Sequence, residues 1–385
     1  MSRQSFLHPI VVSLLALSLF ACDGPAGDTE QASTGELAAV DTATPPVDAS
    51  ETLTGTAEPA GTGSLLEKEI IVLPADQTGL DWLDSAEAWG GLDEAPSLGV
   101  PYLLFTAVGE RWETMSNEMT VQRKKQIFYR FMLPLVLHAN KMVRERRARV
   151  LDLQAGLADG RSLTPEDIEF LRQGLVELRI AGDDDVADLS ISTPELGAWL
   201  DQVLVRLDEI PAGLALGQAA YESGYGTSRF AIQGNALFGQ WTYGGEGIKP
   251  EEQRTSLGDH RIASFEWPFD SVRGYFMNLM SHPSYADFRR LRAQQRAAGE
   301  PLDSLVLADG LLKYSERGQA YVDDLKGIIS HNGLDEADDV ELRDEPMHFV
   351  VVADDQAAVA DIETELDQMR ESGELVTIYE RMRLD

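Results

Sequence analysis

Glu222 stands where a carboxyl group could be kept protonated near neutral pH. The sequence predicts a helix of small apolar residues from Pro211, and Gly224 and Gly226 follow Glu222 directly to end it. Desolvation and the negative end of the helix dipole would both raise the pKa of a carboxyl group placed there. Such an acid can protonate the leaving oxygen of a glycosidic bond. A lone Glu near a helix end is more often an exposed residue, so the flanking pattern decides.

The residues around Glu222 form two linked motifs. The stretch AAYESGYGTSRFAIQGNALFGQW contains A-x-x-E-S-G-[WY]-G-x-S and then G-N-x-L-F-G-Q-W. It resembles the glucosaminidase domain of glycoside hydrolase family 73, and most closely the bacterial Bax-type branch. The resemblance covers roughly Val100 to Asn332. Its other segments, in order, are VPYLLFTAVGERW, KKQIFYRFMLPLVLHANKMV, SVRGYFMNLMSHPSYADFRRLR and LADGLLKYSERGQAYVDDLKGIISHN.

Glycosidic cleavage needs an acid at the leaving oxygen and stabilisation of an oxocarbenium-like centre. Glu222 is the candidate acid. In the resembled family a second carboxylate often follows the GQW segment, where this chain has four acidic residues. The spacing before Phe265 best suits Glu252, although the Bax-type branch departs from the family pattern in this region. The four candidates are Glu246, Glu251, Glu252 and Asp259, and each alone could equally belong to a solvated acidic loop.

A second route needs no further carboxylate. The acetamido oxygen of an N-acetyl sugar can attack the anomeric carbon itself, as in substrate-assisted hydrolases. An aromatic hydroxyl would then orient the sugar, and the resemblance points to Tyr314 for that role. Tyr321 could be a second such tyrosine, but a core position is the preferred interpretation of it.

Aromatic and amide side chains near Glu222 are candidates to bind the sugar rings. Aromatic rings can stack on the apolar ring faces, and short amides can hydrogen-bond an acetamido group. We assign Phe238 to the core, and Asn235 could equally cap a turn after Gly234. The predicted substrate-binding residues are Tyr225, Asn235, Gln240, Trp241 and Tyr243.

The composition excludes several classes of partner and cofactor. The 385 residues carry a formal net charge of −33, which repels nucleic acid and anionic lipid headgroups. The single cysteine, Cys22, excludes an internal disulfide. The six histidines show no metal-ligand spacing, and no Gly-rich phosphate loop precedes a helix. We therefore predict neither a metal nor an organic cofactor.

The first 64 residues read as export and anchoring segments. Residues 1–21 fit a signal peptide, because the apolar run is too short to span a membrane. The run ends in LFAC, which resembles a bacterial lipobox with Cys22 as the lipidated residue; an ordinary signal peptide is the alternative. Residues 23–64 contain no Lys, Arg or aromatic residue and predict a disordered tether. The expected location is the periplasmic side of the cell envelope, with a lipid anchor in a membrane.

Helix caps and strand patterns order the rest of the chain. Thr120, Thr164 and Thr193 each stand at a predicted helix start, and the last two are followed by Pro and acidic residues. Residues 261–265 are the best candidate strand in a glycine-rich stretch. Later helices are expected over 271–282, 304–314 and 318–329. Strands at 348–352 and 374–379 flank a helix at 356–370, and the strand at 70–73 could join them in a small sheet.

These patterns predict a mainly α fold: a lysozyme-like helical domain with a small β-lobe, plus a short α/β C-terminal extension. The predicted regions are 1–21 (signal peptide), 22–64 (lipidated tether), 65–200 (N-terminal helices), 201–335 (catalytic domain) and 336–385 (β-α-β extension). The predicted function is hydrolysis of β-1,4 bonds next to N-acetylglucosamine in peptidoglycan, by a monomer. The alternatives are a muramidase or lytic transglycosylase, and a non-catalytic glycan-binding or scaffold protein that keeps the cleft.

Overall fold

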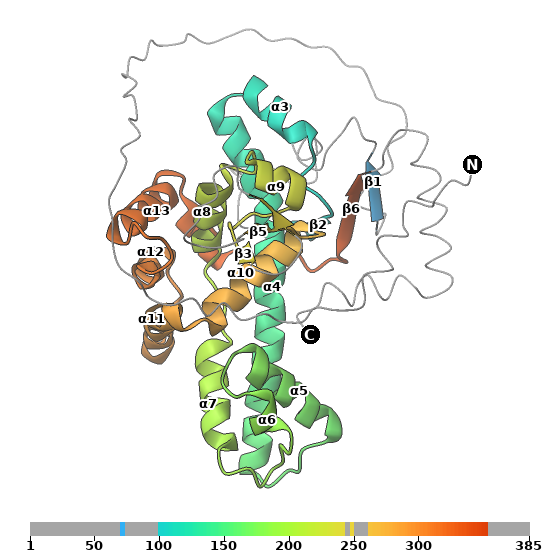
Figure 1. Cartoon of the computed structure of the whole chain (residues 1–385), viewed down its shortest axis with the longest axis vertical. Coiled ribbons are helices and arrows are strands. Elements are labelled where there is room, and N and C mark those ends of the chain that lie inside the picture. The colour runs from blue at the N-terminus through green and yellow to red at the C-terminus, as the bar shows by residue number, and fades with distance from the viewer. Residues whose placement is uncertain (1–69, 74–98, 243–246, 250–260, 353–385) are drawn as a thin grey trace, which may run out of the picture. The chain divides into compact units, whose positions relative to one another are not determined.

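The helix α4 (Val121–Ala158) is the longest element of the fold. The computed structural model describes residues 70–73, 99–242, 247–249 and 261–352, within the compact unit Lys68–Asp385. Thr120 caps α4 as predicted, since its hydroxyl accepts a hydrogen bond from the amide of Arg123. Helices α5 to α7 surround the C-terminal half of α4 (Figure 1). Helices α8 and α10 pack against α4 closer to its N-terminus (Figure 1).

The helices near the C-terminal end of α4 test two predicted caps. Thr164 begins α5 (Pro165–Glu177) with the expected capping box, in which Thr164 and Asp167 bond each other's backbone amides. The prediction for Thr193 was wrong. Its hydroxyl accepts from the amide of Ser190 at 3.0 Å instead, so α7 (Leu196–Arg206) begins three residues later. The short helix α6 (Asp183–Val186) lies between them.

Helix α8 (Ala212–Ser223) is at the centre of the domain, and residues 211–220 are all buried. It packs against α4, α12, α13 and the 3-10 helix η8. This burial follows from its small, uncharged side chains, which let neighbouring backbones approach closely. The other helices are α3 (Arg111–Glu118), α9 (Arg229–Gly234), α10 (Pro268–Ser281), α11 (Ala286–Ala298), α12 (Ser304–Ala308) and α13 (Gln319–His331), with 3-10 turns η6 (Pro283–Tyr285), η7 (Asp309–Leu311) and η8 (Leu334–Asp339).

We predict that a methyl group at Gly213 of α8 destabilises the domain. A Cβ there would lie 2.3 Å from the carbonyl oxygen of Leu334, a backbone atom that cannot rotate away. Gly213→Ala should therefore lower the free energy of unfolding by about 1–3 kcal/mol. Gly327→Ala in α13 is the matched control, because its Cβ would meet nothing within 4 Å and should add about 0.5–1 kcal/mol of helix stability. Urea unfolding of both variants checks this; equal shifts would contradict the close approach.

Two small sheets complete the fold. The first is parallel, with strand order β1-β6-β2, and pairs β1 (Ile70–Leu73) with β6 (His348–Val352). This confirms the predicted pairing of 70–73 with 348–352. Strand β2 (Leu103–Phe105), on the other side of β6, was not predicted. The helix and strand expected at 356–370 and 374–379 lie outside the described residues.

The second sheet is the expected β-lobe. It is antiparallel, with strand order β3-β5-β4. Its strands are β3 (Trp241–Thr242), β4 (Gly247–Ile248) and β5 (Arg261–Ala263), so the strand predicted at 261–265 is confirmed in its first three residues. The fold is mainly α with small β parts, as predicted for a lysozyme-like domain.

The N-terminal predictions cannot be compared with this fold, because residues 1–64, including Cys22, lie outside the described part. Where the structure does describe the chain, it contains no helix long and apolar enough to cross a membrane. The described residues also contain no cluster of His, Cys, Asp and Glu that could hold a metal ion.

Candidate active site

Glu222 is the second-last residue of α8, and the residues after it turn the chain sharply. Gly224 ends the helix in the left-handed conformation, with φ 58° and ψ 44°. Tyr225 is also left-handed, with φ 61°, and its amide donates to the carbonyl of Ala220 at 3.1 Å. The buried hydroxyl of Ser223 accepts from the amide of Gly226 at 2.9 Å. The E-S-G-Y-G motif therefore holds Glu222 at a rigid helix end.

The carboxyl group of Glu222 is half-buried and accepts a hydrogen bond at Oε1. The donor is the hydroxyl of Tyr321 in α13, at 3.1 Å. Burial raises the pKa of Glu222 above its ordinary value, and the hydrogen bond from Tyr321 opposes this rise. The direction agrees with the sequence-based expectation of a raised pKa.

A buried amide sets the direction of this hydrogen bond. Gln218 lies one helical turn before Glu222 and is fully buried. Its Nε2 donates to the Tyr321 hydroxyl at 2.9 Å, and its Oε1 accepts from the Tyr275 hydroxyl at 2.6 Å. Since the Tyr321 oxygen already accepts from Gln218, its own proton points to Glu222. We call Tyr275, Gln218, Tyr321 and Glu222 the relay.

Stacked aromatic rings flank the relay. Tyr314 stacks on Tyr321 with ring centroids 5.5 Å apart and planes 11° apart, and its hydroxyl donates to the carbonyl of Phe238 at 3.3 Å. The ring centroids of Tyr285 and Tyr314 lie 5.8 Å apart. Burial raises the pKa of Tyr314, and the charges of Tyr321 and Glu222 add to the rise. Burial also raises the pKa of Tyr285 to about 12. These hydroxyls therefore stay protonated at neutral pH and can only act as neutral partners.

The structure brings the predicted Tyr314 into the electrostatic environment of Glu222, but it also adds Tyr321. The core interpretation of Tyr321 is confirmed by its 1% exposure, yet its hydroxyl contacts the candidate acid directly. Glu252 and Tyr243 lie outside the described residues, as do Glu246, Glu251 and Asp259. Trp241 lies in β3, and its side chain lies outside the described part as well.

Two predicted amide ligands are used inside the protein. Asn235 ends α9 in the left-handed conformation, accepts from the amide of Val108, and donates to the carbonyls of Phe265 and Glu266 at 3.1 and 2.9 Å. Both polar atoms of its side chain thus bond the backbone, which fits the capping alternative, and both Nδ2 hydrogens are used. Gln240 exchanges hydrogen bonds with Ser271 through both ends of its amide.

The predicted aromatic residues divide between core and surface. The ring of Tyr225 is half-buried and packs edge-on against Phe128 and Tyr129 of α4, with centroids 5.9 and 6.0 Å away. Phe238 is buried, as predicted, and stacks on Tyr275 with centroids 4.0 Å apart and planes 7° apart. Tyr225 is thus part of an aromatic cluster with α4, which its position in the motif does not reveal.

Sequence reasoning missed Gln218, Tyr275 and Tyr285. Tyr275 and Tyr285 lie more than fifty residues after Glu222 in the chain, and no local pattern links them to it. Gln218 did carry a signal: it is the one amide in the otherwise apolar run from Ala212 to Ala220. A buried amide has to find hydrogen-bond partners, so it marks a buried polar network.

Comparison with known proteins defines the class first. Residues 202–334 match the family model of glucosaminidases, described as mannosyl-glycoprotein endo-beta-N-acetylglucosaminidase. This segment contains Glu222, the whole relay and the stacked tyrosines. It is a glucosaminidase-family domain, and the class supports glycoside hydrolase activity.

The relationship to a particular protein is more limited. The chain is 32% identical over 133 residues to Protein bax of Escherichia coli (strain K12). The match covers 34% of this chain and 46% of that protein. The matched part of the chain is therefore similar to a Bax-type glucosaminidase domain, and the chain spans about half the length of this relative. No solved structure matches it.

Proposed function

We propose that the domain hydrolyses β-1,4 glycosidic bonds next to N-acetylglucosamine in peptidoglycan, with Glu222 as general acid. The observation that carries the proposal is the half-buried carboxyl group of Glu222, whose pKa burial raises. A raised pKa lets a carboxyl group hold its proton to higher pH than a solvated one does, and delivery of a proton to the leaving oxygen is what the reaction requires of the protein. The family match supports the glycosidase class.

The relay assigns different tasks to the two oxygens of Glu222. Oε1 accepts the Tyr321 proton, so the acidic proton belongs on Oε2. Oε2 faces Gly239, where an added Cβ would lie 3.5 Å away. Gly239 has φ +60°, and its missing side chain leaves room beside Oε2. A glycosidic oxygen can therefore approach the acid from the side of Gly239, at the end of the N-A-L-F-G-Q-W segment.

The second catalytic group is either a carboxylate or the acetamido group of the substrate. Burial and Tyr321 account for the pKa shift of Glu222, and no other described carboxylate contributes to it. Glu252 remains our candidate for a carboxylate, with the acetamido oxygen of the substrate as the other route and Tyr314 orienting it. Glu252→Gln distinguishes them: a loss as large as that of Glu222→Gln assigns the carboxylate, and an unchanged rate assigns the acetamido route.

The ends of the digested glycan strands test the proposed bond. N-acetylglucosamine reducing ends support the proposal. Muramic reducing ends would make the enzyme a muramidase, and anhydromuramic ends a lytic transglycosylase. Binding to purified walls with no release of soluble fragments would favour the non-catalytic scaffold instead.

We expect Tyr321→Phe to move the alkaline limb of the pH–rate profile to higher pH. The hydroxyl of Tyr321 stabilises the charged form of Glu222, so its removal should raise the pKa of Glu222 further. A hydrogen bond to a charged group contributes about 1.5–3 kcal/mol, so a shift of about one to two pH units is expected. Initial rates against pH measure it.

Tyr221→Phe is the control for this experiment. Its ring packs edge-on against Tyr321 with centroids 5.3 Å apart, but its hydroxyl bonds Arg317 and stands outside the relay. The control should leave the alkaline limb in place. If both variants shift it equally, the limb does not report the hydrogen bond between Tyr321 and Glu222.

A further inference from the structure

An open groove lies between α7 and α11, and it belongs to neither the relay nor the stacked tyrosines. Its volume is about 520 Å³. Its lining includes Gln202, Val205, Arg206, Arg289, Ala293 and Ala297. Ala293 and Ala297 of α11 line the groove, and Val205 of α7 is 45% exposed. None of the nine lining residues carries a carboxylate.

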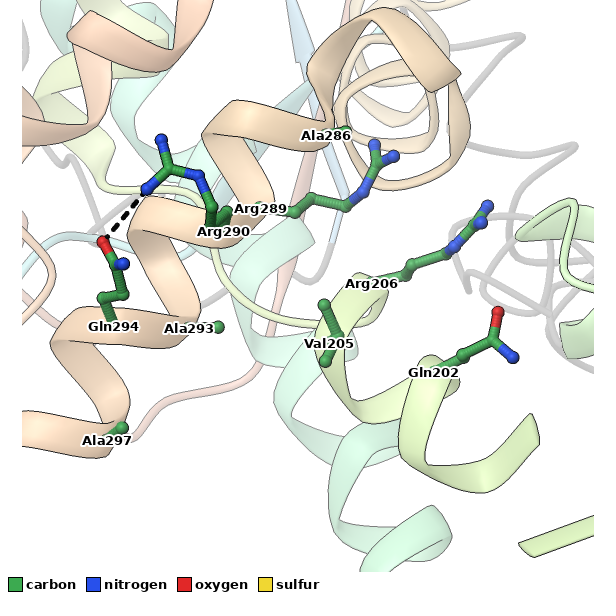
Figure 2. Close-up of a pocket in the computed structure, with 9 residues that line it drawn as sticks. All are labelled: Gln202, Val205, Arg206, Ala286, Arg289, Arg290, Ala293, Gln294 and Ala297. Carbon is green, nitrogen blue, oxygen red and sulfur yellow. Dashed lines mark hydrogen bonds between the residues drawn. The ribbon is translucent and has the colours of Figure 1, made fainter. Parts of the chain in front are cut away.

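Two arginines place their head groups on the same side of the groove. Figure 2 shows the side chains of Arg206 and Arg289 extending to the same side, with the Gln202 amide near Arg206, whereas Arg290 turns away toward Gln294. Arg289 is only 5% exposed. Two cations and an amide without an acid are unusual on a chain with a net charge of −33.

Each of these arginines uses only one nitrogen inside the protein. Nη1 of Arg289 donates to the carbonyls of Leu279 and His282 at 2.8 and 2.9 Å. Nη1 of Arg206 donates to three carbonyls, including that of Ser281 at 3.2 Å. Within the described part of the chain, Nε and Nη2 of both residues have no hydrogen-bond partner. That edge of a guanidinium is the fork that binds a carboxylate through two parallel hydrogen bonds.

The charges of the groove are not neutralised by the fold. Burial and the nearby Arg206 lower the pKa of Arg289 to about 10. Burial and Arg179 lower the pKa of Arg206. The carbonyls at the ends of α5 and α10 offset part of this repulsion, but no carboxylate does so among the described residues. A bound anion would remove the remaining repulsion.

We propose that this groove binds a carboxylate carried on a short aliphatic chain, such as the C-terminus of a small peptide. The arginine edges would hold the carboxylate, and Val205, Ala293 and Ala297 would contact the aliphatic part. These three apolar side chains favour such a ligand over free phosphate. The source of this carboxylate, the peptides of peptidoglycan, rests on the proposed function. The class of ligand rests on the groove alone.

Titration of the full-length protein with N-acetyl-alanyl-alanine tests the groove, with calorimetry or arginine side-chain NMR as readout. The same dipeptide with an amidated C-terminus lacks only the carboxylate, and inorganic phosphate at equal ionic strength is an anion without an aliphatic part. The free dipeptide should bind, and the other two should bind at least about tenfold more weakly. Equal binding of phosphate, or no binding of the dipeptide, would overturn the proposal.

Gln202→Glu places a competing carboxylate beside the two guanidinium groups. It should weaken dipeptide binding about tenfold, because an intramolecular anion then pairs with the arginines. Gln122→Glu is the matched control, since Gln122 is exposed in α4 and adds the same charge outside the groove. Glu222→Gln should bind the dipeptide like the wild type, so a failure of the proposed hydrolysis would leave this result intact. Unchanged binding by Gln202→Glu would place the ligand elsewhere.

Discussion

Replacing Glu222 with Gln is expected to lower peptidoglycan hydrolysis by about 10²–10⁴-fold, the usual contribution of a general acid. Gln has nearly the same shape and can still accept a hydrogen bond from Tyr321, so the fold around α8 should persist. It has no proton to give to the leaving oxygen. Release of soluble fragments from purified walls measures the loss, and unchanged binding to the walls would show that only the chemistry is affected.

The control for this result is Glu300→Gln. Glu300 is exposed and follows α11, so the same change of charge should leave the rate unaltered. A Glu222→Gln variant that keeps wild-type activity would remove Glu222 from the mechanism. Full loss in both variants would point to an effect of overall charge instead.

Glu222→Gln should also be more stable than the wild type at neutral and alkaline pH. Because burial raises the folded pKa of Glu222 above its ordinary value of 4.5, the folded state binds this proton more tightly than the unfolded state does. Its contribution to stability is complete below the unfolded pKa and is lost as pH rises through the folded pKa. Gln stays neutral throughout, so the gap in melting temperature should close toward about pH 4. A gap that is independent of pH would contradict the raised pKa.

Arg292→Met is expected to lower the free energy of unfolding by about 3–5 kcal/mol. Arg292 is fully buried. Nη1 donates to the carbonyls of Asp208 and Glu209 at 2.7 and 3.1 Å, and Nη2 donates to those of Val205 and Arg206 at 3.1 and 2.7 Å. Met would fill much of the volume but leave these four carbonyls without their donor. A loss of this size is a large part of the stability of an ordinary domain.

The position of Arg292 gives this loss a consequence for the site. The four carbonyls lie at the end of α7 and in the link that enters α8, and Asn140 holds the same link through both the amide and the carbonyl of Ile210. Loosening the link should therefore disturb the helix that presents Glu222, and activity should fall together with stability.

Arg290→Met is the matched control, on the same helix. Arg290 is exposed and, among the described residues, hydrogen-bonds only Asp287 and Gln294, at 3.3–3.4 Å. Its loss should therefore change stability by less than about 0.5 kcal/mol. Urea unfolding with unchanged slopes compares the two. A loss below about 1 kcal/mol for Arg292→Met would show that water replaces the guanidinium group.

Local sequence was sufficient for several features of this protein. Small residues and the glycines after Glu222 predicted a buried helix ending in a turn, because small side chains allow close packing and left-handed backbone favours Gly. The caps of α4 and α5 and the strand β5 followed from similar local rules. Strand patterns also suggested the pairing of β1 with β6, and the family resemblance suggested the β-lobe. The cap predicted at Thr193 did not form, and its hydroxyl bonds the amide of Ser190 instead.

Tertiary structure decided which groups surround Glu222. Nothing local connects Tyr275, Tyr321 and Gln218, since their hydrogen bonds form only when α10 and α13 pack against α8. Separate tertiary contacts join the amide of Asn235 to the backbone of Val108, Phe265 and Glu266, although its motif suggested a ligand. The raised pKa of Glu222 could be expected from a helix end, but the donor that opposes it and the oxygen left to carry the proton depend on contacts between residues about a hundred positions apart.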